Sequence, residues 1–173
     1  AAGTAVTTGG INTLIGGLSG DAITIGNSNV AVGYNSLTTE VAGDRSVAVG
    51  HGSLALQTNA STVDVYNTAV GYNAGYAVTT GGANTLIGGL AGDAQTTAAN
   101  STAVGYAALG ANTTGANNTA IGKEALDANT TGSENVCVGV GALGANTTAA
   151  NNVAVGVNAL LANTTGTDNV AVG

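Results

Sequence analysis

Large side chains are scarce in this chain of 173 residues. It contains no Phe, Trp, Met or Pro, and Tyr, with five copies, is its only large aromatic residue. The side chains that usually fill a globular core are therefore missing, yet 44% of the residues are hydrophobic, mostly Ala, Val, Leu and Ile. That fraction is too high for a disordered segment. Together with 29 glycines, it indicates a thin, regular and tightly stacked structure.

Positive charge is also nearly absent. Arg45 and Lys123 are the only basic residues, and the net charge is −7. Binding to nucleic acid requires clustered Lys and Arg, so we expect no nucleic-acid partner. No apolar run approaches the roughly 20 residues that a membrane helix needs, and we expect no direct insertion into a membrane.

Cysteine occurs once, at Cys137, which excludes a disulfide framework within the chain. No Met opens the sequence, and no signal peptide precedes its first repeat. We therefore expect residues 1–173 to be a single repeat array belonging to a longer fibrous protein.

One phrase, of the type NNVAVG, recurs along the whole chain. Its closing glycine returns every 17 residues, except for one interval of 21 residues between Gly50 and Gly71. That longer interval is a four-residue insertion near residues 57–66. Each repeat is called a coil, and the residues at one position in successive coils are called a column. The closing glycines are Gly16, Gly33, Gly50, Gly71, Gly88, Gly105, Gly122, Gly139, Gly156 and Gly173.

The columns before the closing glycine predict a strand. The residue one before it is always Val or Ile, the residue three before it is always Val or Thr, and the residue between them is mostly Ala. β-Branched residues at alternate positions favour a β-strand. The residue four before the glycine is Asn, or Ser at Ser46 and Ser101, and stacked Asn side chains predict an amide ladder.

After the glycine the coil turns. The residue four after it is Leu in six coils and Gly at Gly20, Gly75 and Gly92. NTTG segments follow, and their Asn and Gly fit turn positions with positive φ. A period of 17 is too short for helix-pair repeats of about 33–47 residues. It fits one turn of a parallel β-solenoid, in which strands lie about 4.8 Å apart, so we predict an all-β parallel solenoid of about ten 17-residue coils.

Both faces of the predicted strand are apolar in every coil, which is unusual for a sheet with one solvent-exposed side. A coil has one interior and can bury only one face, so the other face would form an apolar stripe along the rod. Such a stripe indicates an interface, and a cyclic homo-oligomer would bury it along its symmetry axis. The sequence leaves open which face points to the axis.

These columns carry a family resemblance. The segments NNVAVGVNAL, NNTAIGKEAL and ENVCVGVGAL resemble the head repeats of trimeric autotransporter adhesins. The longer segment NTTGANNTAIGKEALDANTTG is more similar to repeats of phage tail-fibre proteins. The resemblance covers nearly the whole chain and implies a left-handed parallel β-roll, with three intertwined or side-by-side chains in each rod.

The resemblance also implies a function. It places the chain outside the cell, on a virion or on a bacterial surface, with a cell-surface glycan or protein as receptor. The coil is longer than that of the adhesin heads, which favours a structural and adhesive segment of a trimeric viral tail fibre. The alternative is the head of a bacterial trimeric adhesin.

The insertion is the main candidate for recognition. In a regular rod an insertion bulges outward, and protruding loops often carry binding residues. Its polar candidates are Asn59, Thr62 and Asp64. A plain connecting loop is the alternative interpretation.

Two similar segments, GGLSGDAI and GGLAGDAQ, resemble the calcium-binding nonapeptide of β-helix proteins. This likeness makes Asp21 and Asp93 candidate metal ligands. The fourth position and the period do not fit the nonapeptide, and two exposed turns are the alternative interpretation.

Catalysis finds little support. His51, Ser53 and Asp44 are close enough in sequence for a Ser-His-Asp arrangement, but His51 stands in a column that holds Tyr in three other coils. A ring on the surface of the turn is the favoured interpretation. Cys137 occupies a column of small residues without a neighbouring cation, which favours a buried residue over a nucleophile. We expect no catalytic residue and no cofactor.

Overall fold

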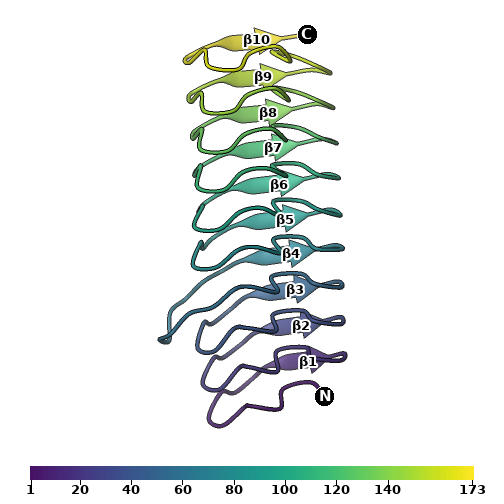
Figure 1. The fold of residues 1–173 in the computed structure, drawn as a ribbon, viewed down its shortest axis with the longest axis vertical. Coiled ribbons are helices and arrows are strands. Elements are labelled where there is room, and N and C mark those ends of the chain that lie inside the picture. Colours follow the sequence, from purple (N-terminus) through teal and green to yellow (C-terminus); the bar gives the residue numbers. More distant parts are fainter.

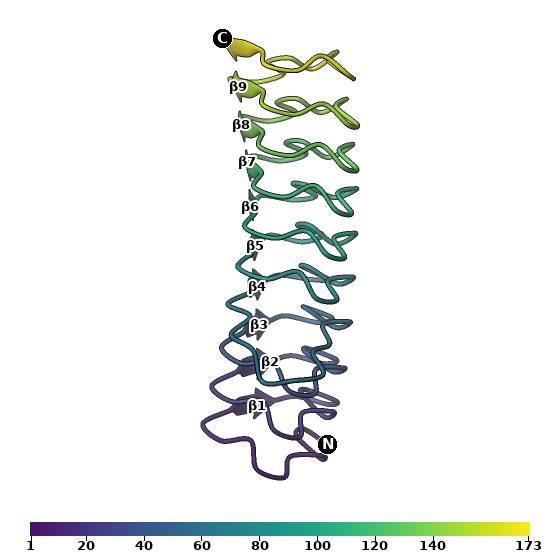
Figure 2. The same cartoon turned by 90° about the vertical axis from the view of Figure 1, so that its left-hand side faces the viewer.

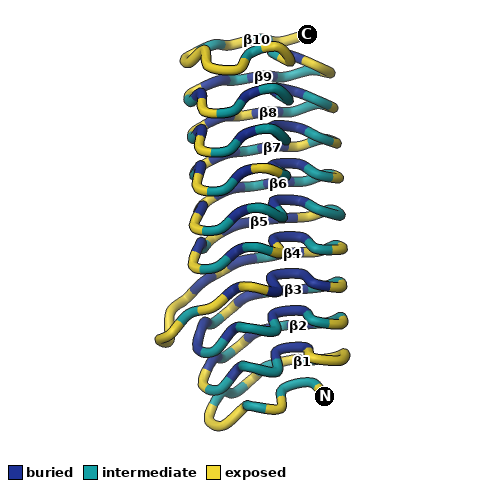
Figure 3. Tube along the Cα trace, viewed as in Figure 1, coloured by how far each residue is buried: buried dark blue, intermediate teal, exposed yellow.

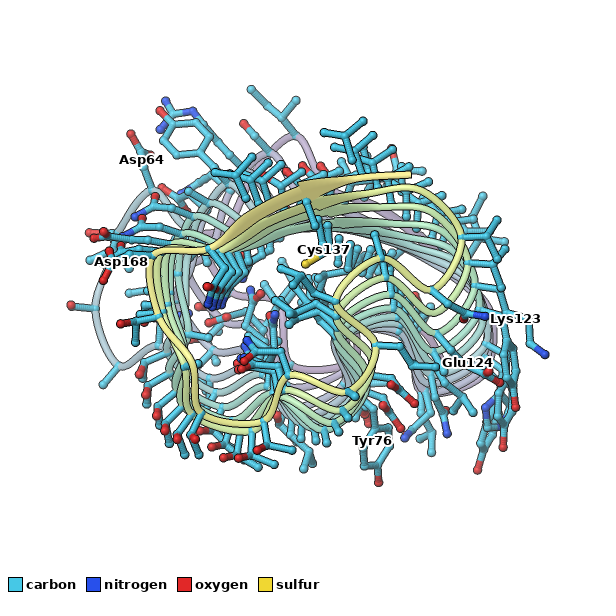
Figure 4. The ribbon with its side chains drawn as sticks, turned by 90° about the horizontal axis from the view of Figure 1, so that it is seen from above. Asp64, Tyr76, Lys123, Glu124, Cys137 and Asp168 are labelled. Carbon is cyan, nitrogen blue, oxygen red and sulfur yellow. The ribbon has the colours of Figure 1, made fainter.

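The computed structural model describes residues 1–173 as one parallel β-solenoid without a helix (Figure 1). Ten strands of three residues form a single sheet in sequence order, so the predicted all-β solenoid is confirmed. The chain rises toward the viewer in Figure 4 while it turns clockwise, which makes the coil left-handed. The strands are β1 (Thr13–Ile15), β2 (Val30–Val32), β3 (Val47–Val49), β4 (Thr68–Val70), β5 (Thr85–Ile87), β6 (Thr102–Val104), β7 (Thr119–Ile121), β8 (Val136–Val138), β9 (Val153–Val155) and β10 (Val170–Val172).

Each strand pairs with the same three positions of the next coil. Val30 pairs with Val47, and Val47 pairs with Thr68 on the other side of the insertion. The four additional residues therefore leave the register unchanged, and the coils stack evenly along the rod (Figure 2). Constant register keeps every column in line from one end of the rod to the other.

The closing glycine is required by the close approach of successive coils. At Gly88 φ is +135°, and a Cβ would lie 2.4 Å from the carbonyl oxygen of Gly105. The other closing glycines of the array have φ between +125° and +141°. A side chain here would combine an unfavourable backbone conformation with a steric clash, so only glycine fits.

The middle residue of each strand faces the interior, whereas the two β-branched residues face outward. Ala48, Ala103 and Cys137 are fully buried, whereas Val47 and Thr102, which precede the two alanines, are only half-buried. The opposite wall of the core comes from the turn, where Leu109 and the equivalent leucines are also fully buried, except Leu160 of the last turn, which is half-buried. Figure 3 shows these buried segments at the same place in successive coils.

Leucines and glycines exchange places across this core. Leu86 replaces the usual Ala of the strand, and glycine replaces the usual Leu of the turn at Gly75 and Gly92 on either side of it. A Cβ at Gly75 or Gly92 would lie 2.7 or 2.8 Å from a methyl carbon of Leu86. Leu14 has the same relation to Gly20. In the GGLxGDA segments, the core is therefore filled by a leucine of the strand in place of a leucine of the turn.

The predicted amide ladder is confirmed. Asn118 accepts a hydrogen bond from the backbone N–H of Asn135 at 3.0 Å and donates its own side-chain N–H to the carbonyl of Gly132 at 2.8 Å. The pattern recurs in the neighbouring coils, for example from Asn135 to Asn152. Buried amides are stable here because the adjacent coil supplies both kinds of partner.

The predicted turn geometry of the NTTG segments is wrong. Asn112 and Gly115 do not have positive φ; the left-handed residues lie elsewhere, for example at Leu109 and Asn117. Asn112 points inward instead and accepts a hydrogen bond from the side chain of Asn129 at 2.8 Å. A second amide ladder takes the place of the expected turn, because the neighbouring coils satisfy these side chains better than solvent-exposed turns would.

Candidate functional site

The insertion is the one long excursion from the rod, and Figure 1 shows the segment that joins β3 to β4 projecting from the side of the rod. Its first half is tied to a buried carboxylate. Glu40 is fully buried, and its Oε2 accepts hydrogen bonds from Gln57 and Asn59, each at 2.8 Å. Its Oε1 accepts four backbone N–H groups, among them that of Asn59 at 3.0 Å. Asn59 therefore anchors the loop.

The second half of the insertion is held by charge. Asp64 forms an ion pair with Arg45 and accepts a hydrogen bond from the hydroxyl of Tyr66 at 3.0 Å. The Arg45 guanidinium also lies 5.9 Å from the centre of the Tyr66 ring, at a cation–π distance. Of the three sequence candidates, Asn59 and Asp64 are engaged within the chain, and Thr62 lies exposed at the tip.

Glu40 was not identified from the sequence. The sequence feature that could have identified it is its column: Glu40 is the only carboxylate there, and the other coils carry amides or aliphatic side chains, such as Gln57 and Val78. A charge at that place in a buried column requires a dense set of donors, and the insertion supplies three of them.

Asp21 and Asp93 lie four coils apart and are not brought together. Asp21 accepts a hydrogen bond from the Thr38 hydroxyl at 2.6 Å. Burial raises the pKa of Asp93 above its ordinary value, and backbone hydrogen bonds oppose that rise. No group of three or more His, Cys, Asp and Glu side chains is close enough to hold a metal ion.

The residues considered for catalysis are also separate. The Ser53 hydroxyl is buried and donates to the carbonyl of Gly50 at 3.0 Å, and the Asp44 carboxylate accepts the backbone N–H of Asn27 at 2.6 Å. Neither forms a hydrogen bond with His51, which lies exposed on the turn. Cys137 points into the core (Figure 4), and burial raises the pKa of its thiol to about 12. Such a thiol is a poor nucleophile.

The sequence predicts that His51 is a ring on the surface of the turn. In the structure, His51 is also part of an aromatic stack. Its ring lies between those of Tyr34 and Tyr72, with 5.4 Å between ring centres on each side and interplanar angles of 30° and 24°. Tyr34 and Tyr72 are 54% and 58% exposed, so this row of rings is open to solvent.

A shallow groove was missed from the sequence. It encloses about 340 Å³ on the turn side of β7 to β9, at a place where two turn glycines leave space. Burial, with the negative charge of Glu124 as a smaller cause, raises the pKa of Asp127 in this groove. Glu124 is paired with the adjacent Lys123 at 3.3 Å. The lining residues are Glu124, Asp127, Val140, Gly141, Gly144, Ala145, Asn158 and Leu161.

No family of known proteins matches this chain, and neither do the curated proteins or the solved structures. The structure contains no helix with the length and apolar character needed to cross a membrane.

The most extensive surface feature is the outer face of the sheet. The column one before the closing glycine is aliphatic in all ten coils, and Val70, Ile87 and Ile121 in it are 36%, 39% and 40% exposed. The column three before the glycine adds a parallel row of Val and Thr. A single chain thus leaves an apolar stripe along the rod, as the sequence predicts, and the face that stays uncovered is the β-branched one.

Proposed function

We propose that this chain is a structural and adhesive segment of an extracellular homotrimeric rod, as in a viral tail fibre that attaches to a host cell. The observation that carries the proposal is the apolar stripe on the outer face of β1 to β10. Soluble proteins rarely expose a continuous apolar surface of this length, and such surfaces mark interfaces. Three parallel copies would bury the stripe against one another around a threefold axis.

The long, regular rod is suited to holding a binding surface away from its point of attachment. The chain has 106 backbone hydrogen bonds, of which only 18 lie within the strands, so the turns are bonded to neighbouring coils as well. A rod bonded along its whole outline resists bending, and it can hold a binding surface at a distance from its base. Three copies on one rod would convert weak contacts with a cell-surface glycan or protein into firm attachment.

The trimer is tested by sedimentation equilibrium of the purified chain over a range of concentrations. We expect three times the mass of the monomer, 16.2 kDa per chain. A folded species that remains monomeric at micromolar concentration would contradict the proposal.

A bacterial adhesin head is the second candidate, and the column pattern of NNVAVGVNAL supports it. The two candidates differ in where the rod is displayed. Immunogold labelling with an antibody raised against the purified rod is expected to decorate virus particles. Label on the bacterial envelope, with none on particles, would favour the adhesin.

A further inference from the structure

The groove on the turn side of β7 to β9 exists because one turn lacks two side chains. Gly141 and Gly144 follow β8, in the columns two and five after the closing glycine. Every other turn between β1 and β10 has a side chain in at least one of these columns, and the turns after β7 and β9 have side chains in both. The two glycines therefore form a floor between two walls.

Oxygen atoms from both adjacent turns reach this floor. A Cβ on Gly144 would lie 3.4 Å from Oδ1 of Asp127, and a Cβ on Gly141 would lie 2.5 Å from Oδ1 of Asn158. Glu124 is the third polar residue of the lining. Asp127 has no side-chain partner, since only backbone groups offset the burial of its carboxyl. The floor is thus bordered by acceptors that can take further hydrogen bonds.

The rest of the lining is aliphatic. The Cδ1 atom of Leu161 would lie 3.3 Å from a Cβ on Gly144, and Leu161 and Val140 are 45% and 46% exposed. The groove therefore combines acceptors with apolar surface. Its volume of about 340 Å³ lies at the lower end of the range for small ligand sites.

The charge of the groove calls for a cation from another molecule. Glu124 and Asp127 place two carboxylates in one groove, and the negative charge of Glu124 contributes to the raised pKa of Asp127. The only two basic residues of the chain are already engaged. Lys123 pairs with Glu124 at 3.3 Å without lining the groove, and Arg45 pairs with Asp64.

The acceptors suit an organic cation better than a metal ion. Ca²⁺ takes about six to eight oxygen ligands, whereas no three His, Cys, Asp or Glu side chains of the chain lie close enough to hold an ion. An alkylammonium has three N–H donors for the three polar residues of the lining, and its carbon stem can cover apolar surface. A guanidinium is a planar fork that suits a single carboxylate.

We propose that this groove binds a lysine side chain of a protein partner, with the ammonium at Glu124 and Asp127 and the carbon stem along Leu161. The choice of a protein rests on the proposed attachment function; the choice of an ammonium does not. Figure 4 shows Glu124 on the turn side of the rod, away from the outward face of the sheet. The groove would therefore stay open in a trimer, which would present three copies of it.

The test follows the methyl signals of the purified chain by NMR while Nα-acetyl-lysine amide is added at millimolar concentration. We expect the signals of Val140 and Leu161 to shift and those of Leu90, which lies outside the groove, to stay unchanged. The same compound acetylated at Nε keeps the stem and loses the charge. It is expected to bind about fivefold more weakly or less.

Three results would overturn parts of the proposal. No shift at Val140 and Leu161, or equal binding of the charged and the acetylated compound, would overturn the ammonium site. Tighter binding of Nα-acetyl-arginine amide would overturn the choice of lysine. Much tighter binding of n-butylamine, the lysine side chain without its backbone, would assign the groove to free amines and overturn the choice of a protein.

Two matched pairs of variants locate the site. Asp127→Asn removes a charge from the groove and is expected to lower the affinity for the lysine amide about fivefold. Asp93→Asn removes a charge from the same column outside the groove and is expected to change nothing. Gly144→Leu fills the groove with the side chain that Leu161 has in that column, and is expected to abolish binding. Gly110→Leu, beside Asp93, is its control.

Thermal unfolding of the four variants shows whether the fold is kept, and Asp127→Asn tests the site even where Gly144→Leu fails to fold. Equal effects of Asp127→Asn and Asp93→Asn would contradict the location of the site.

The outcomes separate the groove from the proposed function. A trimer that does not distinguish lysine from its acetylated form would contradict the groove and leave the rod intact. A monomeric chain that binds the lysine amide at Leu161 would contradict the trimer and leave the ammonium site standing.

Discussion

At the scale of single residues, the distance between coils decides which side chains are tolerated. Gly88 and Gly89 are adjacent, yet only Gly88 lies where a Cβ would meet the next coil, 2.4 Å from a carbonyl oxygen. The sequence identifies Gly88 as invariant among the coils but does not state the reason. The reason is a contact with a residue 17 positions away.

The substitutions Gly88→Ala and Gly89→Ala form a matched pair. Gly88→Ala is expected to lower the free energy of unfolding by more than about 2 kcal/mol, because it adds a clash to a strained φ. Gly89→Ala is expected to change it by less than about 0.5 kcal/mol. Chemical denaturation of both variants measures the difference, and equal effects would contradict this account of the coil spacing.

Cys137 is expected to make the rod sensitive to alkali. Burial raises the pKa of its thiol from 9.0 to about 12, so above pH 9 the unfolded chain loses a proton that the folded chain retains. The folded state then binds more protons than the unfolded state, and the free energy of unfolding falls as pH rises from 9 to 12.

Cys137→Ala, which restores the common residue of that column, is expected to remove this part of the alkaline loss. Denaturant titrations of both proteins at pH 8 and pH 10.5 give the comparison. The native thiol is also expected to resist alkylation at pH 8 until the chain is unfolded. Rapid labelling of the folded protein would contradict its burial.

At the scale of the coil, strand and turn adjust to each other. Leu appears in the strand column only where glycine replaces a leucine of the turn, as at Leu86 with Gly75 and Gly92. This covariation was visible in the sequence and indicates that the two columns touch. Its meaning became clear only when the structure placed both columns on opposite walls of one core.

Leu86→Ala is expected to lower the free energy of unfolding by about 3 kcal/mol, because it leaves a cavity between two glycines. The double variant Leu86→Ala with Gly92→Leu recreates the arrangement of the regular coils and is expected to recover at least half of that loss. Gly92 has φ +56°, close to the +55° of Leu109, so the added leucine meets a backbone that other leucines already adopt. Additive losses in the double variant would contradict the proposed exchange.

Glu40 holds the insertion through its hydrogen bonds, so its substitution is expected to destabilise the chain and to loosen the loop. Glu40→Gln replaces a carboxylate oxygen by an amide donor that faces other donors, which costs about 2 kcal/mol or more in a buried site. Limited proteolysis within residues 58–64 is expected to accelerate in the same variant. Glu134→Gln, on an exposed carboxylate, is the control and is expected to be silent in both measurements.

At the scale of the whole molecule, the outward stripe decides whether the rod exists alone. The double variant Val104→Lys with Ile121→Lys places charges in the middle of the stripe without touching the core. It is expected to convert the proposed trimer into a folded monomer, as read by sedimentation and circular dichroism. Thr97→Lys with Thr114→Lys adds the same charges on exposed turn residues and is expected to leave the assembly unchanged.

The sequence by itself determined the solenoid, its coil length, its strand column, its register and one amide ladder. All of these features follow from the 17-residue period, because it places each residue next to the equivalent residue of the adjacent coil. The residues of one column, read from the sequence, are therefore neighbours in space. The tertiary structure alone decided which strand face points outward, where the left-handed residues lie, and how Glu40 anchors the insertion. These features join different columns across the coil, and their geometry depends on how the turn folds back over the strand.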